Sequence, residues 1–305
     1  MIDVIWDMET GDPDDFLTLI LLLGHPGVNL KAVCVTPGSP EQVGLIRHAL
    51  SWFDKEIPVG SYRYNEEWDT KAFQKIPKSL RKNHVSSWHY KTFGDIPPSY
   101  DAEPGWQVYH RLCNEDTTLI TGAPLTNLGR AIQMSPEHKP DFTIGRWFAQ
   151  GGFAGEGVIP EEKQLSKFKG KVTCPTWNLG GAPKAALAAL RYEGIGLKHF
   201  VSKNVCHGVY YNKELHQKLA EYRNKRRSLR KIWDAMVHYL KKRSQGKKFH
   251  DPLAACCAIQ PDIAQWAEVE LYLQKGEWGS RLSPGSQTWI ITDVDMDAFF
   301  EVLVM

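Results

Sequence analysis

The chain has 305 residues, of which 42% are hydrophobic and 24% charged, and its formal net charge is only +2. This length is enough for a large α/β core, and we expect a single domain over residues 1–305. The small net charge provides no global field that would attract a polyanion, so nucleic acid is not expected as a partner. No apolar run approaches the ~20 residues that a membrane-spanning helix needs, and no basic-then-apolar leader opens the chain.

The six cysteines form no C-x-x-C pair, and several of them lie in apolar runs. Buried free thiols are typical of such positions. We therefore expect a reduced, cytoplasmic protein with no membrane partner.

The first element is a short apolar strand at residues 2–6, and an apolar helix is expected at residues 16–23. Between them lie five carboxylates in nine residues: Asp7, Glu9, Asp12, Asp14 and Asp15. Like charges at this density repel, and burying them unpaired costs several kcal/mol, so the segment predicts a bound cation. Oxygen ligands suit Ca²⁺ or Mg²⁺ rather than Zn²⁺. The alternative is that these residues are ordinary helix caps and turn formers.

Strand-like and helical runs then alternate along the chain. Strands are expected at residues 30–35, 57–59, 118–121, 142–149 and 195–201, and helices at residues 40–53, 106–113, 125–134 and 183–192. This alternation predicts an α/β fold with a Rossmann-like, mostly parallel central sheet and helices on both faces. Ligands of such sheets bind beyond the carboxyl ends of the strands, which is where the acidic segment lies. Residues 62–105 read as a long irregular loop, of a kind that is usually functional or mobile.

Residues 212–248 form a basic, helical segment that includes the run at 223–227. One interpretation is a phosphate or nucleic-acid contact. The other is a solvated helix face, which is favoured because aromatic residues are not interleaved with the charges.

A second candidate site lies far downstream, at His250 and Asp251, which precede Pro252 and an apolar helix at residues 253–259. Asp251 as helix N-cap and Pro252 as first helical residue would be a purely structural explanation. The pair also suits a closing active site, in which His250 donates a proton to a leaving group near neutral pH. Both interpretations stay open.

Taken together, these motifs resemble the inosine-uridine-preferring nucleoside hydrolase family over nearly the whole chain. The matching segments are residues 7–15 (D-x-D-x-G-x-D-D in the family), 122–127 (G-P-L-T-N), 151–152 (M-G-G), 177–178 (E-[FW]-N), 250–252 (H-D-P) and 295–300 (D-x-D-x-F-[FW]). The resemblance implies a Ca²⁺-dependent hydrolase of nucleoside N-glycosidic bonds that forms a homodimer or homotetramer. Mg²⁺ is the less favoured ion. It also implies that residues 212–248 are a helical insertion over the pocket.

The resemblance implies roles residue by residue. The metal ligands would be Asp7, Glu9, Asp15, Asp251 and a backbone carbonyl of Thr121 or Gly122. Glu9 would also take a proton from water, and His250 would contact the leaving group. The substrate contacts would be Asp14, Ser39, Trp88, His89, Gln150, Thr176 and Asn178, with Trp88 and His89 joining Tyr90, Phe93 and Phe249 as candidates for an aromatic stacking wall. Each of these aromatic residues could equally be an ordinary loop anchor.

The chain departs from the family pattern around the water and the sugar's 5′ side. Glu9 replaces an Asp, and the acidic loop is one residue longer, so Asp12 could be a substitute ligand. Ser39 replaces an Asn, Thr176 replaces a Glu that normally holds the ribose 5′-hydroxyl, and Ala123 is inserted. A site built for a hydroxyl discriminates strongly when that hydroxyl changes. We therefore expect common nucleosides to be poor substrates, and a 5′-modified or otherwise unusual ribosyl compound to be the better one.

Three functional hypotheses follow. The leading one is a metal-dependent N-ribosyl hydrolase. The second is a family member that binds a ribosyl ligand and has lost turnover, which the Glu9 replacement would explain. The third is a nucleic-acid-binding protein that uses residues 223–248, for which binding would depend steeply on salt.

Overall fold

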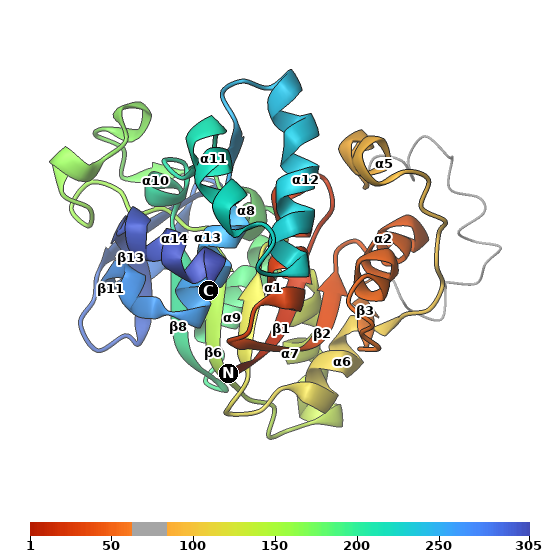
Figure 1. The fold of residues 1–305 in the computed structure, drawn as a ribbon. Helices are drawn as coiled ribbons and strands as arrows, with labels where there is room; N and C mark the ends of the chain where they lie inside the picture. The colour runs from red at the N-terminus through yellow and green to blue at the C-terminus, as the bar shows by residue number, and fades with distance from the viewer. Residues whose placement is uncertain (63–83) are drawn as a thin grey trace.

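The computed structural model describes residues 1–62 and 84–305 (Figure 1). Its strands are β1 (Ile2–Met8), β2 (Val28–Val35), β3 (Val59–Ser61), β4 (Glu103–Pro104), β5 (Thr118–Thr121), β6 (Ile144–Gln150), β7 (Thr173–Cys174), β8 (Ile195–Val201), β9 (Tyr210–Tyr211), β10 (Lys247–Lys248), β11 (Ala264–Gln274), β12 (Glu277–Leu282) and β13 (Thr288–Val294). Its α-helices are α1 (Pro13–Gly24), α2 (Pro40–Ser51), α5 (Ser87–Phe93), α6 (Gly105–Leu112), α7 (Thr126–His138), α8 (Trp177–Gly181), α9 (Pro183–Arg191), α10 (Lys203–Cys206), α11 (Lys213–Tyr222), α12 (Arg227–Lys242), α13 (His250–Ile259) and α14 (Met296–Val304).

The main sheet has the strand order β4-β3-β2-β1-β5-β6-β8-β13-β11-β12-β7. All pairs from β4 to β13 are parallel, whereas β11, β12 and β7 extend the sheet with antiparallel pairs. The predicted α/β fold with a mostly parallel sheet is confirmed. The antiparallel extension was not predicted, because β11, β12 and β13 follow one another without an intervening helix to mark them and β7 has only two residues.

The strand order reverses at β1, which determines where the helices pack. The chain runs outward from β1 to β2 and β3, then returns to β5 on the other side of β1 and continues to β6 and β8. Right-handed crossovers therefore place the helices of the two halves on opposite faces. The contacts agree, since α1 packs with α2, α12 and α13, whereas α7 packs with α6 and α9.

This reversal places the end of β1 at the crevice where open α/β sheets bind ligands. β1 is buried over most of its length, as its run of apolar residues predicts. At its end, Asp7 is paired with Thr121 at the end of β5, and the Gly122 amide donates to the Asp7 carbonyl oxygen at 2.8 Å.

Most element boundaries lie near the expected ones, and β5 and β8 match them in full. At two helix starts the structure differs from an expected start and from one of two open interpretations. Helix α1 begins at Pro13, so that Asp14 and Asp15 belong to its first turn. Helix α13 begins at His250 with Phe249 as N-cap, so Asp251 is not the cap residue. Within the loop expected at 62–105, the structure has α5 and β4, and residues 63–83 lie outside the described residues.

The basic run at 223–227 is used largely within the chain itself. The Arg223 guanidinium lies 4.4 Å from the Trp233 ring centroid, and the Lys225 ammonium lies 4.3 Å from the Tyr222 ring. Arg226 donates to the Gly24 carbonyl oxygen at 3.1 Å. These contacts favour a structural role for the run over a nucleic-acid surface.

Among the described residues, the structure contains no helix with the length and apolar character needed to cross a bilayer. All six cysteines are buried and unpaired, as expected from their positions in apolar runs.

The close packing of α7 on α9 can be tested at Gly129. A Cβ atom added there would lie 2.4 Å from the Ala185 Cβ, whereas at Gly180 it would meet nothing within 4 Å. Gly129→Ala should lower the free energy of unfolding by about 1–3 kcal/mol because it overpacks this contact. Gly180→Ala is the matched control and should be neutral or slightly stabilising. Urea denaturation measures both, and equal effects of the two substitutions would contradict the packing assignment.

Candidate functional site

Three carboxylates from opposite ends of the chain converge beyond the carboxyl ends of the strands. Asp14 and Asp15 come from the first turn of α1, and Asp251 comes from the first turn of α13. One carboxylate oxygen from each lies within 4.8 Å of the others, and all three side chains are buried. The packing of α1 against α13 therefore joins the two motifs that the sequence places more than two hundred residues apart.

The three carboxylates, Asp14, Asp15 and Asp251, are called the triad below. Their burial and mutual repulsion favour a bound cation. Burial and the charges of Asp251 and Glu9 raise the pKa of Asp15 well above its usual value. Burial and the Asp14 charge do the same for the pKa of Asp251, whose Oδ1 has no hydrogen-bond partner among the described residues. Burying such groups unpaired costs several kcal/mol. Because every available donor is a carboxylate oxygen, the triad fits a hard divalent ion such as Ca²⁺ or Mg²⁺.

Asp7 lies at the end of β1, paired with Thr121 of β5, and its carboxylate is not part of the group of three that converges. Burial raises the pKa of Asp7 to about 6, while hydrogen bonds from Tyr109 and Asn127, at 2.7 and 3.1 Å, lower it. A Cβ atom on Gly122 would lie 2.6 Å from the Asp251 Oδ1. Only glycine therefore lets the Asp251 carboxylate lie so close to the backbone that follows Thr121.

Glu9 points toward the exposed side of the triad. Its amide donates to the Asp15 Oδ1 at 3.0 Å, and its Oε2 accepts a hydrogen bond from the Trp177 indole at 3.1 Å. Burial raises the pKa of Glu9 to about 7, with further increases from Asp14 and Asp12 and a decrease from Trp177. The Trp177 side chain is 73% exposed, so this contact lies at the mouth of the site.

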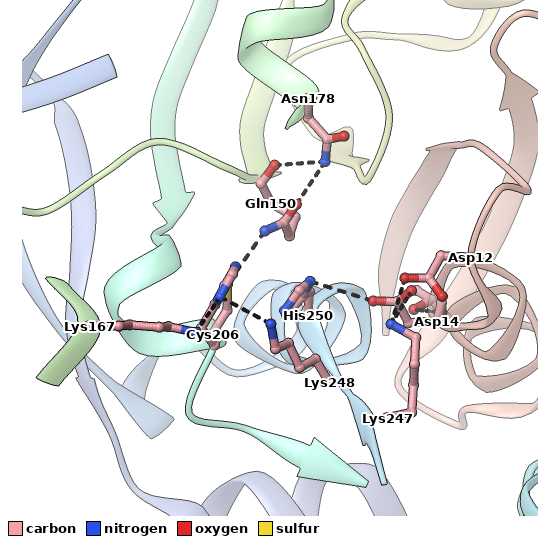
Figure 2. A network of polar contacts seen from close by, with 11 residues as sticks. Asp12, Asp14, Gln150, Lys167, Asn178, Cys206, Lys247, Lys248 and His250 are labelled. Atoms are coloured by element: carbon pink, nitrogen blue, oxygen red, sulfur yellow. Dashed lines mark hydrogen bonds and ion pairs between the residues drawn. The ribbon is translucent and has the colours of Figure 1, made fainter. Parts of the chain in front are cut away.

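Lys247 is a site residue that the sequence analysis missed. Its ammonium lies 2.8 Å from the Asp12 carboxylate and 3.0 Å from that of Asp14, and its side chain is only 6% exposed (Figure 2). The two carboxylates outweigh the cost of burial and raise the pKa of Lys247 above its usual value. Asp12 is formally the N-cap of α1 but makes no capping bond, so its partner is Lys247. The acidic segment is thus a charge cluster rather than a set of ordinary caps.

His250 lies 3.8 Å from Asp14 but is surrounded by lysines. Burial and the charges of Lys247, Lys248 and other lysines lower the pKa of His250 to about 3. The imidazole is then neutral at pH 7. These surroundings work against the expected proton donation from His250 near neutral pH.

A second group of possible metal ligands lies on the other side of His250. Cys206, His207 and His250 place ligand atoms within 4.8 Å of one another, and the two imidazoles stack at 4.7 Å. The Lys167 ammonium, however, donates to the His207 Nδ1 at 2.8 Å, and Lys248 lies 3.4 Å from the same atom. Two ammonium groups at this distance repel a metal cation, so the group does not fit one.

Gln150, at the end of β6, and Asn178, on α8, form a polar pair. The Asn178 amide donates to the Gln150 Oε1 at 2.7 Å and to its carbonyl oxygen at 3.0 Å. Gln150 in turn donates to the Cys206 sulfur at 3.4 Å, which links the pair to the histidine stack (Figure 2).

The remaining expected contacts occupy different environments. Ser39 caps α2 in a capping box with Gln42. Thr176 is buried, and its hydroxyl has no partner among the described residues. His89 is fully buried edge-on against Phe16, so it anchors α5 to the core.

A cleft of about 670 Å³ opens beside the triad. It lies between the acidic loop, α5, the end of α12 and the segment around β10, with Trp88 and His250 among its lining residues. Of the aromatic residues expected to form a stacking wall, Trp88 is the one that lines this cleft.

The sequence comparison agrees with this geometry. The family model described as inosine-uridine preferring nucleoside hydrolase matches residues 4–301. The chain belongs to this family. No curated protein sequence matches it significantly.

Solved structures of family members share the fold at low identity. An inosine-uridine preferring nucleoside hydrolase from Bacillus anthracis is 18% identical, with a TM-score of 0.68 over 99% of this chain and 98% of that one. A purine-preferring ribonucleoside hydrolase from Gardnerella vaginalis has the same identity and TM-score over 99% and 96% of the two chains. A plant nucleoside hydrolase, also 18% identical, has a TM-score of 0.66 over 99% and 98%.

The cation site can be tested with Asp251→Asn. Calcium at about 100 times its Kd should stabilise the unaltered protein by about 2.7 kcal/mol, and the substitution should remove this gain. Without calcium the variant should be at least as stable as the unaltered protein, because one of three buried like charges is gone. Calorimetry with calcium and with a chelator measures both effects. Asp116→Asn, at an exposed and remote carboxylate, is the control, and a calcium response that survives in Asp251→Asn would contradict the assignment.

Proposed function

We propose that the protein is a Ca²⁺-dependent N-ribosyl hydrolase that cleaves the N-glycosidic bond of a nucleoside-type compound by attack of water at C1′. The observation that carries this proposal is the buried triad of Asp14, Asp15 and Asp251 at the crevice of a nucleoside hydrolase fold. The large, oxygen-only donor set favours Ca²⁺ over Mg²⁺, which demands stricter geometry and keeps more of its water.

Asp15 and Asp251 would hold the ion together with Asp7 and the carbonyl of Thr121, and Asp14 would hold both the ion and the ribose diol. A bound Ca²⁺ supplies a positioned water of lowered pKa. Loss of the base leaves an oxocarbenium-like ribosyl cation, and the surrounding carboxylates stabilise its positive charge.

Glu9 is the residue proposed to take the water proton. The C1′–O bond forms as the C1′–N bond breaks, and the electron pair of the broken bond leaves with the base. Trp177 orients Glu9 through the hydrogen bond to its Oε2. Glu9 is longer than the Asp that the family has here, and the loop that carries Glu9 is also one residue longer. The longer loop would let the Glu9 carboxylate occupy the place of the family's Asp carboxylate.

The substrate would span the site from the polar pair to the cleft. Asn178 and Gln150 suit the ribose hydroxyls, while His250 and Trp88 suit the leaving group because they line the cleft. On the 5′ side, Thr176 offers a hydroxyl where the family has a carboxylate. Ser39 is committed to its helix cap. Both features support a substrate other than the common nucleosides.

The proposal is tested by release of free ribose from a nucleoside panel in the presence of calcium, with Glu9→Gln as the matched variant. The unaltered protein should release ribose from at least one member. Glu9→Gln should lower kcat by about 10²–10⁴, the usual contribution of a positioned general base.

Calcium-dependent binding without any ribose release would instead favour the second hypothesis, a ligand-binding member that has lost turnover. Efficient hydrolysis of inosine near the diffusional limit would contradict the expected preference for unusual substrates.

The role of Trp177 is tested by Trp177→Phe. This substitution keeps an aromatic ring at an exposed position and removes only the donor to Glu9, so kcat should fall by about two- to tenfold. The calcium-dependent thermal shift should be unchanged, because Trp177 contacts no member of the triad. A change in KM alone, with kcat preserved, would show that Trp177 contacts substrate rather than positioning Glu9.

A further inference from the structure

The cleft beside the triad is lined by many more cations than anions. Its cationic lining residues are Lys91, Lys242, Arg243, Lys247 and Lys248. Its acidic lining residue is Asp12, whose carboxylate is already paired with Lys247. Among residues 1–62 and 84–305, the other four cations have no acidic partner within ion-pair distance.

These cations come from three separate elements. Lys91 lies on α5, Lys242 and Arg243 end α12, and Lys247 and Lys248 form β10. The end of a helix favours cations because of its dipole, which would explain the α12 residues alone. It does not explain why α5 and β10 direct cations to the same cleft, nor why Lys247 is buried there.

Residues that line the cleft also carry buried polar atoms that the described chain leaves unpaired. Trp88 Nε1, Thr92 Oγ1 and His250 Nε2 are buried polar atoms of lining residues, and none has a hydrogen-bond partner within the described parts of the chain. An indole nitrogen can only donate, so an acceptor is the natural partner for Trp88. The cations and the rings of Trp88 and Tyr239 together suit a flat anion.

The position of the charges relative to the substrate decides which part of it is anionic. The cleft is lined by His250 and Trp88, which the proposed function assigns to the leaving group, and not by Asn178 or Gln150, which it assigns to the ribose. We infer that the leaving group of the substrate is an aromatic heterocycle that carries a negatively charged substituent, such as a carboxylate. This inference rests on the proposed function for the orientation of the substrate.

The cations would act on binding and on departure of the base. They pair with the anionic substituent in the bound substrate, and they stabilise the electron pair that the base takes from the C1′–N bond.

The test compares two pairs of matched substrates in calcium-containing buffer. The first pair is uridine and orotidine, which is uridine with a carboxylate at position 6. The second pair is nicotinamide riboside and nicotinate riboside. At least one carboxylated member should show a kcat/KM, or an affinity by calorimetry, about tenfold or more above that of its neutral partner. The preference should shrink as salt is raised, because exposed ion pairs are screened. Uridine 5′-monophosphate, with its charge on the sugar, should gain no such advantage over uridine.

The double variant Lys242→Gln/Arg243→Gln should lower kcat/KM or affinity for the carboxylated member about two- to fivefold more than for its neutral partner. Lys241→Gln is the matched control, because it removes an exposed charge from the same helix end but does not line the cleft. Equal effects of the two variants would show that the preference comes from the overall positive charge of the helix end and not from binding in the cleft.

The outcomes separate this inference from the proposed function. The inference is overturned, even if ribose is released, when kcat/KM and affinity are equal for both members of both pairs. A preference for uridine 5′-monophosphate over uridine overturns it as well. A carboxylate preference in binding without release of ribose supports the inference while the proposed hydrolysis fails.

Discussion

The site depends on one electrostatic constraint, the burial of more carboxylate charge than the chain itself neutralises. Asp14, Asp15 and Asp251 share one small volume, and the ammonium of Lys247 pairs with only the first of them. Two buried carboxylates therefore lack a counter-charge. The free-energy cost of burying these charges exceeds the stabilisation from the chain's own hydrogen bonds. A divalent cation would offset this cost, and the stability of the fold would then depend on the ion that the proposed chemistry requires.

The strand order explains why such distant residues meet. Because the order reverses at β1, the end of that strand faces an open crevice rather than a neighbouring crossover helix. Helix α13 then packs against α1 and the ends of β5 and β6, which brings Asp251 to the first turn of α1. Gly122 completes the arrangement, since any side chain there would collide with Trp6 and the Asp251 carboxylate.

The sequence predicted the parts of the site that are local in the chain. The acidic segment follows a buried strand directly, and the H-D-P segment begins an apolar helix, so both motifs and the α/β alternation could be read in order. The environment of His250 could not be predicted in full, because two of its four lysines, Lys167 and Lys203, come from distant parts of the chain. The role of Lys247 could not be predicted from the sequence either. In the sequence it is one of several lysines after a basic helix, and only the approach of β10 to α1 makes it a buried partner of Asp14. The hydrogen bond between Glu9 and Trp177 joins residues 168 positions apart, which no local pattern encodes.

The charges of the site form two opposed groups, and their arrangement matches the bond that the proposed reaction breaks. The carboxylates gather at the strand ends around α1, whereas the lysines gather at the cleft beyond His250. Cleavage of an N-glycosidic bond separates charge in the same sense, with positive charge growing on the sugar and negative charge on the base. A field fixed by folding needs no reorganisation when that charge develops, which is where preorganised sites gain most of their effect. Lys247 stands at the boundary between the two groups. By pairing with Asp12 and Asp14 it offsets the charge of both carboxylates next to the cleft, so that the ribose and the base of the proposed substrate would meet potentials of opposite sign.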